Sequence, residues 1–180
     1  MKAVAISRWA LLVCLGIVLT ACGASKPKPA QIPPIKADKP IQALWQFKLG
    51  SDVSFVQSLQ TVQERMVLTS DDGKIAVVNV LNGQAVWRHE LKTALNTGAG
   101  FDGKHVAVVT LNNELLLLQD GKVLWRNRLS SQSYTHPLVA GERVFMMMAD
   151  RSVMAFDLAT GVRLWTQQRP GEPLVLKQNG

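Results

Sequence analysis

Cysteine is almost missing from this chain of 180 residues, which contains only Cys14 and Cys22. No thiol therefore remains after residue 22 for a disulfide, a cysteine nucleophile or a zinc site built on thiolates. Histidine is also scarce, and His89, His105 and His136 do not stand at metal-ligand spacing from one another. We therefore expect a domain that carries no metal centre and relies on its packed core for stability.

Other signatures are absent as well. After residue 21 no stretch of helical length has a 3.6-residue apolar period, and no Gly-rich phosphate loop precedes a helix. Acidic residues gather in predicted turns, such as Asp71 and Asp72, where turn chemistry explains them better than paired acid–base catalysis. No stretch combines stacked aromatic and basic residues as single-strand binders do. We expect no enzyme activity, no cofactor and no nucleic-acid partner.

The longest apolar run, Trp9–Ala21, has 13 residues, whereas a membrane-spanning helix needs about 20. With Lys2 and Arg8 before it, the run predicts a secretory signal peptide over residues 1–21. It ends in Leu19-Thr-Ala-Cys22, which resembles the lipobox of bacterial lipoproteins. That resemblance implies cleavage before Cys22, acylation of Cys22 and, because Gly23 rather than Asp follows, an outer-membrane address. Several acyl chains would make a stable anchor.

Residues 22–43 are the expected lipid anchor and tether, and within them the Pro- and Lys-rich stretch Ser25–Pro40 should be extended and span roughly 50 Å. The signal peptide contributes two of the seven net positive charges, and the tether contributes three. Residues 41–180 carry only +2. The basic character of the chain thus belongs mostly to its first 40 residues and does not indicate a nucleic-acid-binding domain.

A repeat dominates the remaining sequence. Gly-x-x-x-Trp occurs three times with its Trp residues 38 and 40 positions apart, and a further Trp lies 42 positions before the first of these. Each copy contains apolar runs of four to eight residues bounded by turn residues, which is typical of strands. A four-stranded antiparallel unit of this length is one β-propeller blade. The repeat positions are Trp45, Gly83, Trp87, Gly121, Trp125, Gly161 and Trp165.

Each Gly of the repeat is expected to form the hairpin between the third and fourth strands, where positive φ favours glycine. Each Trp is expected to pack in the seam between neighbouring blades, with its indole N–H on a backbone acceptor. Packing explains the Trp residues better than ligand stacking, because the position recurs in every unit. Leu44–Leu49 matches the fourth-strand pattern without the Gly turn, so we expect it to close the last blade from the other end of the chain.

We therefore predict an all-β fold, a propeller segment over residues 44–180. The expected blades occupy about 50–91, 92–129 and 130–168, and residues 169–180 would begin the next one. Propellers close with roughly four to eight blades. Three blades are too few for a ring, so we expect this sequence to be incomplete, either a fragment of a longer protein or the result of a premature stop.

The Gly-x-x-x-Trp repeat, preceded in one copy by Asp157-Leu-Ala-Thr, looks like the pyrroloquinoline-quinone-type propeller repeat. Together with the lipobox, the tether and the strand around Trp45, it resembles the BamB family, the eight-bladed propeller lipoproteins of the outer-membrane β-barrel assembly machinery. The resemblance implies a non-catalytic scaffold anchored at the periplasmic face of the outer membrane. It also implies two partners: a BamA-type POTRA domain and unfolded outer-membrane proteins.

One segment carries the expected contact with BamA. Members of the family have a Leu-x-Leu-Arg stretch after the third blade that docks onto a POTRA domain, and Leu174-Val-Leu176-Lys177 stands at the matching place. The resemblance makes Leu174 and Leu176 the apolar anchors and Lys177 the charge, although Lys lacks the planar fork of Arg. From the residues alone, the two leucines fit the inward face of a strand equally well.

Two alternatives remain open from the sequence. A periplasmic quinoprotein dehydrogenase shares the repeat, but such enzymes add a disulfide of adjacent cysteines, calcium-binding acids and a catalytic Asp, none of which is visible here. A ligand-binding propeller is the other alternative.

Overall fold

The structure is a computed structural model that describes residues 42–50, 53 and 59–171. These residues belong to one compact unit that begins at Gln42. They form strands and no helix, so this part of the chain has no helix that could cross a membrane. The predicted signal peptide and Cys22 lie outside the described residues, as do Leu174, Leu176 and Lys177.

The described strands form three antiparallel sheets of four strands each, and within each sheet the strands are neighbours in chain order. The first sheet contains β1 (Thr61–Val62), β2 (Arg65–Thr69), β3 (Lys74–Asn79) and β4 (Ala85–Glu90). The second contains β5 (Gly100–Phe101), β6 (His105–Val109), β7 (Glu114–Gln119) and β8 (Lys122–Arg128). The third contains β9 (Leu138–Ala140), β10 (Arg143–Met147), β11 (Ser152–Asp157) and β12 (Arg163–Gln168).

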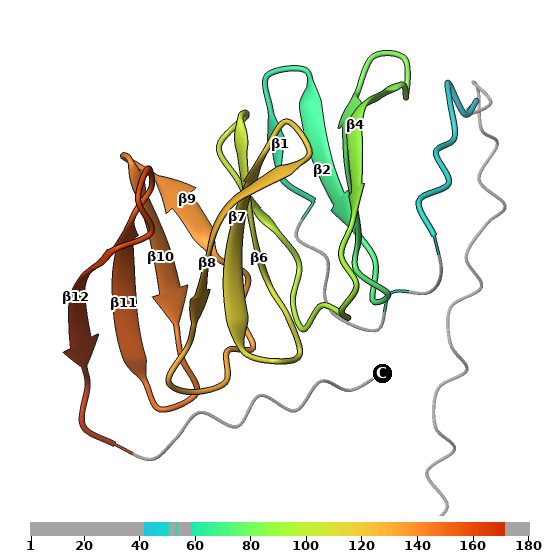
Figure 1. The fold of residues 1–180 in the computed structure, drawn as a ribbon. Helices are drawn as coiled ribbons and strands as arrows, with labels where there is room; N and C mark the ends of the chain where they lie inside the picture. Colours follow the sequence, from blue (N-terminus) through green and yellow to red (C-terminus); the bar gives the residue numbers. More distant parts are fainter. Residues whose placement is uncertain (1–41, 51–52, 54–58, 172–180) are drawn as a thin grey trace, which may run out of the picture. The chain divides into compact units, whose positions relative to one another are not determined.

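The three sheets stand side by side as propeller blades (Figure 1). The predicted all-β fold with four-stranded antiparallel blades is therefore confirmed. Short strands joined by tight turns follow from apolar runs too short for helices and from glycine at the turns, where Gly83, Gly121 and Gly161 have φ of 69°, 73° and 73°.

The middle strands of the second blade are buried on both faces because a blade lies on each side. In β7, Leu115 to Leu118 are all buried. Successive side chains of a strand point to opposite faces. Leu116 and Leu118 accordingly pack in one hydrophobic cluster with the first blade, whereas Leu115 and Leu117 pack in another with the third. A continuous apolar run thus builds two inter-blade cores at once.

The outermost strands β4, β8 and β12 lie at the edge of their sheets. Each has a β-bulge at the same place, because the strand pairing skips one residue just before the repeated Trp. The skipped residues are Val86, Leu124 and Leu164. An extra residue in an edge strand bends it and redirects a side chain.

Residues 42–49 form no ladder with any described strand, although Trp45 contacts the first blade. A strand assignment requires a hydrogen-bonded partner strand. The closure of a last blade by Leu44–Leu49 therefore stays a prediction.

Candidate functional site

One contact between an indole ring and a glycine turn occurs twice in the structure. Trp45 lies against the turn of the first blade and donates its indole N–H to the carbonyl oxygen of Val80 at 2.8 Å. A Cβ added to Gly83 in that turn would lie 2.6 Å from the Trp45 ring. Only glycine fits here, because the site combines a positive φ with direct ring contact.

The same contact joins the second and third blades. Trp125 donates its indole N–H to the carbonyl oxygen of Leu158 at 2.8 Å, and a Cβ on Gly161 would lie 2.7 Å from the ring. The side-chain amide of Asn127 also donates to the carbonyl oxygen of Gly161 at 2.5 Å. The Trp of one blade therefore covers the Gly hairpin of the next.

The seam between the first and second blades is looser at the corresponding position. A Cβ on Gly121 would lie 3.7 Å from the Trp87 ring, which is ordinary van der Waals contact, and 3.3 Å from the carbonyl oxygen of Arg88. The turn is shorter here, because β8 begins at Lys122, directly after Gly121. Trp87 is half-buried and packs against the hydrophobic cluster between these two blades.

Trp165 differs from the other three in its surroundings. It lies on β12 at the same place in the repeat, but 42% of it is exposed. Its ring contacts Phe145 on β10, two strands away in the same sheet, with the ring centroids 6.1 Å apart. No Gly hairpin of a following blade lies over it among the described residues, and this accounts for the difference.

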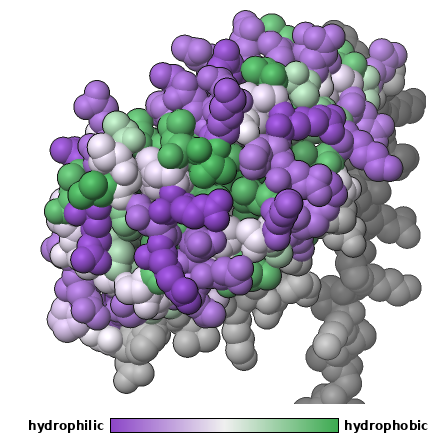
Figure 2. Space-filling model, in the orientation of Figure 1, coloured by the Kyte–Doolittle hydropathy of each residue, from purple (hydrophilic) through white to green (hydrophobic). Residues whose placement is uncertain are grey.

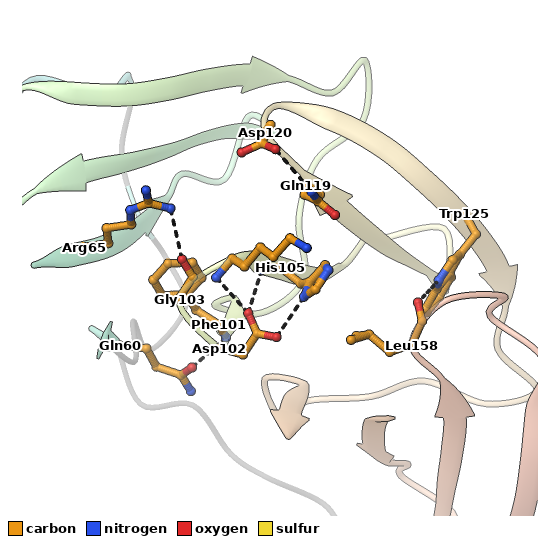
Figure 3. A network of polar contacts seen from close by, with 11 residues as sticks. Gln60, Arg65, Phe101, Asp102, Gly103, His105, Gln119, Asp120, Trp125 and Leu158 are labelled. Carbon is orange, nitrogen blue, oxygen red and sulfur yellow. Dashed lines mark hydrogen bonds and ion pairs between the residues drawn. The ribbon is translucent and has the colours of Figure 1, made fainter. Parts of the chain in front are cut away.

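Polar contacts also join the first two blades (Figure 3). The side-chain oxygen of Gln60 accepts a hydrogen bond from the amide of Phe101 at 2.7 Å. The guanidinium of Arg65 donates to the carbonyl oxygen of Gly103 at 3.3 Å. These contacts hold the turn between β5 and β6 against the first blade.

Asp102 organises that turn from within. Its carboxylate accepts hydrogen bonds from the amides of Lys104 and His105, at 2.8 and 2.6 Å, and contacts Nδ1 of His105 at 2.8 Å. Burial alone would raise the pKa of Asp102, but the hydrogen bonds from the backbone and ring of His105 and from Lys104 outweigh it. The pKa is therefore held below its ordinary value of 3.8.

We expect Asp102→Asn to lower the free energy of unfolding by about 1 kcal/mol near neutral pH, because Asn keeps an acceptor but loses the charge. The folded carboxyl binds its proton more weakly than the unfolded one. The stability that the ionised Asp102 carboxyl contributes is thus complete above pH 3.8, the ordinary pKa. This contribution is lost as the pH falls through the pKa of the folded state, which is lower. Urea unfolding at neutral pH and at about pH 3 should show the difference between the two proteins narrowing in acid. An unchanged difference would contradict the assignment.

The other acids with a lowered pKa also anchor turns. The hydroxyl and amide of Ser152 donate to Asp150 and lower the pKa of its carboxyl. The hydroxyl and amide of Thr160 do the same for Asp157. Asp72 pairs with Lys74 and raises the pKa of that amine, chiefly through their hydrogen bond.

The histidines lie apart. His105 belongs to the β5–β6 turn, and His89 lines an open hollow of about 340 Å³ on the first blade, together with Leu49, Lys74, Ile75, Arg88 and Glu90. Within the part of the chain that the structure describes, no three His, Cys, Asp or Glu residues come together to hold a metal ion.

Reasoning from the sequence missed the outer rim, which we define as residues 42–49 with the edge strands β4, β8 and β12. The residue before each repeated Trp is aliphatic and exposed: Leu44 by 90%, Val86 by 46%, Leu124 by 48% and Leu164 by 46%. Figure 2 shows apolar side chains across the middle of the visible face with hydrophilic ones around them. The signal was present in the sequence as an aliphatic residue before every repeated Trp.

Four-stranded blades whose edge-strand Trp covers the glycine hairpin of the next blade define this protein as a β-propeller built from pyrroloquinoline-quinone-type repeats. The family model described as outer membrane protein assembly factor BamB matches residues 71–180, and the chain belongs to this family.

Curated relatives carry the same description. Outer membrane protein assembly factor BamB of Bordetella pertussis is 29% identical over 168 residues, which cover 93% of this chain and 44% of the relative. The protein of that name from Burkholderia pseudomallei is 28% identical over 165 residues, which cover 89% of this chain and 43% of the relative. The chain thus spans less than half the length of these relatives.

Solved structures agree on the fold. BamB from Moraxella catarrhalis matches with a TM-score of 0.58 and 18% identity, over 68% of this chain and 38% of that one. A europium-containing methanol dehydrogenase matches with a TM-score of 0.60 and 18% identity, over 72% of this chain and 27% of that one. Likeness at this identity supports the architecture and does not separate scaffold from enzyme.

Proposed function

We propose that the chain is part of a non-catalytic scaffold lipoprotein that assists the folding and insertion of outer-membrane β-barrel proteins. The observation that carries the proposal is the family match over residues 71–180, on a chain whose blades have the expected architecture. A propeller suits this role, because a rigid ring of blades presents turns and edges to several partners without a mobile active site.

In this proposal residues 1–21 are a signal peptide and residues 22–43 are the anchor and tether, with acyl chains on Cys22. The blades would then lie on the periplasmic side of the outer membrane, within reach of the machinery that they serve. The lipobox-like Leu19-Thr-Ala-Cys22 supports the anchor, since multiple acyl chains hold a protein stably at a bilayer.

The proposed direct partner is a BamA-type POTRA domain, and the proposed contact is Leu174, Leu176 and Lys177. Two leucines separated by one residue place two apolar anchors on the same side of an extended segment. Lys177 adds a charge beside them. Few residues usually supply most of the binding energy of an interface, and buried apolar anchors are typical of them.

We expect the combined change Leu174→Ala, Leu176→Ala and Lys177→Glu to weaken capture of a purified POTRA domain by at least about tenfold, through loss of two anchors and reversal of one charge. A pull-down with titrated POTRA domain measures the effect.

The matched control is Leu81→Ala, Leu111→Ala and Lys104→Glu, which makes the same exchanges at exposed positions in other turns. It should capture the POTRA domain like the unmodified protein. Equal capture by all three proteins, with circular dichroism unchanged, would remove the docking assignment.

The dehydrogenase alternative is tested separately. Addition of pyrroloquinoline quinone and calcium to the protein, followed by a dye-linked alcohol oxidation assay, should give no turnover if the protein is a scaffold. Turnover above that of the cofactor alone would overturn the scaffold proposal.

A further inference from the structure

The rim has a repeated design. In each described blade the edge strand bulges just before its Trp, and the bulged residue is an exposed aliphatic side chain. Leu44 occupies the corresponding position before Trp45 and is 90% exposed. Bulges at sheet edges redirect side chains. Here the redirected side chain is apolar every time, which packing within the blade does not explain.

Basic residues accompany these aliphatic ones. On β8 the exposed residues are Lys122, Leu124, Arg126 and Arg128, so that the leucine stands between positive charges. Arg88 follows Val86 on β4, where it stacks over the Phe47 ring at 4.4 Å. Acids are also present: Glu90 lies on β4, and Glu114 of β7 is the cross-strand partner of Arg128.

Charge is unevenly distributed over the described residues. The rim has six basic residues and one acid: Lys48, Arg88, Lys122, Arg126, Arg128 and Arg163 against Glu90. The other described residues have seven basic and nine acidic side chains. The rim therefore carries +5 and the rest −2, although residues 41–180 together are only weakly basic.

An anionic surface complements this rim better than an added β-strand does. Strand addition requires a continuous row of backbone groups, and each edge is interrupted by its bulge and lined by charged side chains that discourage pairing. A specific protein partner binds an arrangement of side chains that occurs once, whereas the exposed aliphatic residue before the Trp recurs on successive blades. Exposed aliphatic side chains among Lys and Arg fit the headgroup region of an anionic bilayer.

We propose that the outer rim docks on an anionic phospholipid surface, with Val86, Leu124 and Leu164 entering the headgroup region and the neighbouring Lys and Arg residues contacting lipid phosphates. Docking would hold the propeller edge-on against the bilayer. It goes beyond the proposed scaffold role, because it concerns a surface other than Leu174–Lys177.

The test uses the mature acylated protein with vesicles of phosphatidylcholine, either alone or mixed with phosphatidylglycerol, that contain a dansyl-labelled lipid. Energy transfer from the rim tryptophans to dansyl reports how close the rim lies to the bilayer. The rim variant is Lys122→Glu with Arg126→Glu. The control variant, Lys92→Glu with Lys104→Glu, makes the same charge change at exposed loop positions outside the rim.

We expect energy transfer from the unmodified protein to be higher with anionic than with neutral vesicles, and to fall to the neutral level in the rim variant and in high salt. The control variant should keep the higher transfer. Equal energy transfer with both kinds of vesicle would overturn the proposal. The rim would then either bind an acidic protein partner or serve to prevent pairing of the exposed sheet edges with other strands. Equal losses in the two variants would also overturn it, as a response to net charge alone.

Flotation with neutral vesicles tests the acyl anchor by itself. If the protein did not float with neutral vesicles, this result would count against the proposed lipoprotein. Energy transfer from the rim tryptophans to anionic vesicles, measured with excess lipid, would still decide whether the rim docks. Far-UV circular dichroism of each variant checks that the blades remain folded.

Discussion

Gly161→Ala is expected to lower the free energy of unfolding by about 3 kcal/mol or more. The added methyl group would lie 2.7 Å from the Trp125 ring, so that the indole must move away from the hairpin that it covers. Overpacking of this kind costs about 1–3 kcal/mol. The left-handed backbone at φ 73° adds a further 1–2 kcal/mol for a residue with a Cβ. Urea unfolding followed by tryptophan fluorescence measures the sum.

Gly141→Ala is the matched control. Gly141 also has a positive φ, of 56°, but an added Cβ would meet no atom within 4 Å. This variant should lose only the backbone contribution, about 1–2 kcal/mol. Equal losses at the two glycines would show that contact between Trp125 and the hairpin does not stabilise the seam.

Leu117→Ala should destabilise the protein by about 3 kcal/mol, within the usual range of 2–5 for a buried leucine. Leu117 is fully buried on β7 and packs in the cluster between the second and third blades. β7 is hydrogen-bonded to a strand on each side, so we expect the cavity that the substitution leaves to collapse only in part. Urea unfolding of this variant and of the parent protein measures the loss.

Leu124→Ala, on the adjacent edge strand, supplies the control. Leu124 is 48% exposed, so that its truncation should change the stability by no more than about 0.5 kcal/mol. A loss at Leu124 as large as that at Leu117 would mean that the rim is covered by something in solution. The pair thus separates residues that build the blades from residues that face outward.

The blade itself could be predicted because its information is local. Apolar runs such as Leu115–Leu118 are too short for helices and are bounded by turns, and glycines stand where hairpins require positive φ. The period of the Trp residues then indicates an array of such units. No comparable signal existed for contacts such as that between Gln60 and Phe101, which are 41 positions apart and depend on how the blades stack.

The candidate site was less accessible to such reasoning. The bulges at Val86, Leu124 and Leu164 depend on which residues pair across strands, and an alternating pattern does not reveal a skipped residue. The contact between Arg65 and the carbonyl oxygen of Gly103 was hidden for a similar reason, because it forms only when the second blade is placed against the first.

By itself the sequence determined the repeat, the strands and the glycine hairpins, because these depend on residues a few positions apart. Only the tertiary structure decided which indoles are covered. Trp45 and Trp125 lie on the hairpin of a neighbouring blade, whereas Trp165 shares their place in the repeat but stays exposed. The physical reason is that a side chain is buried only when two surfaces pack together. The residue and its neighbours along the chain form one of these surfaces, and the next blade supplies the other.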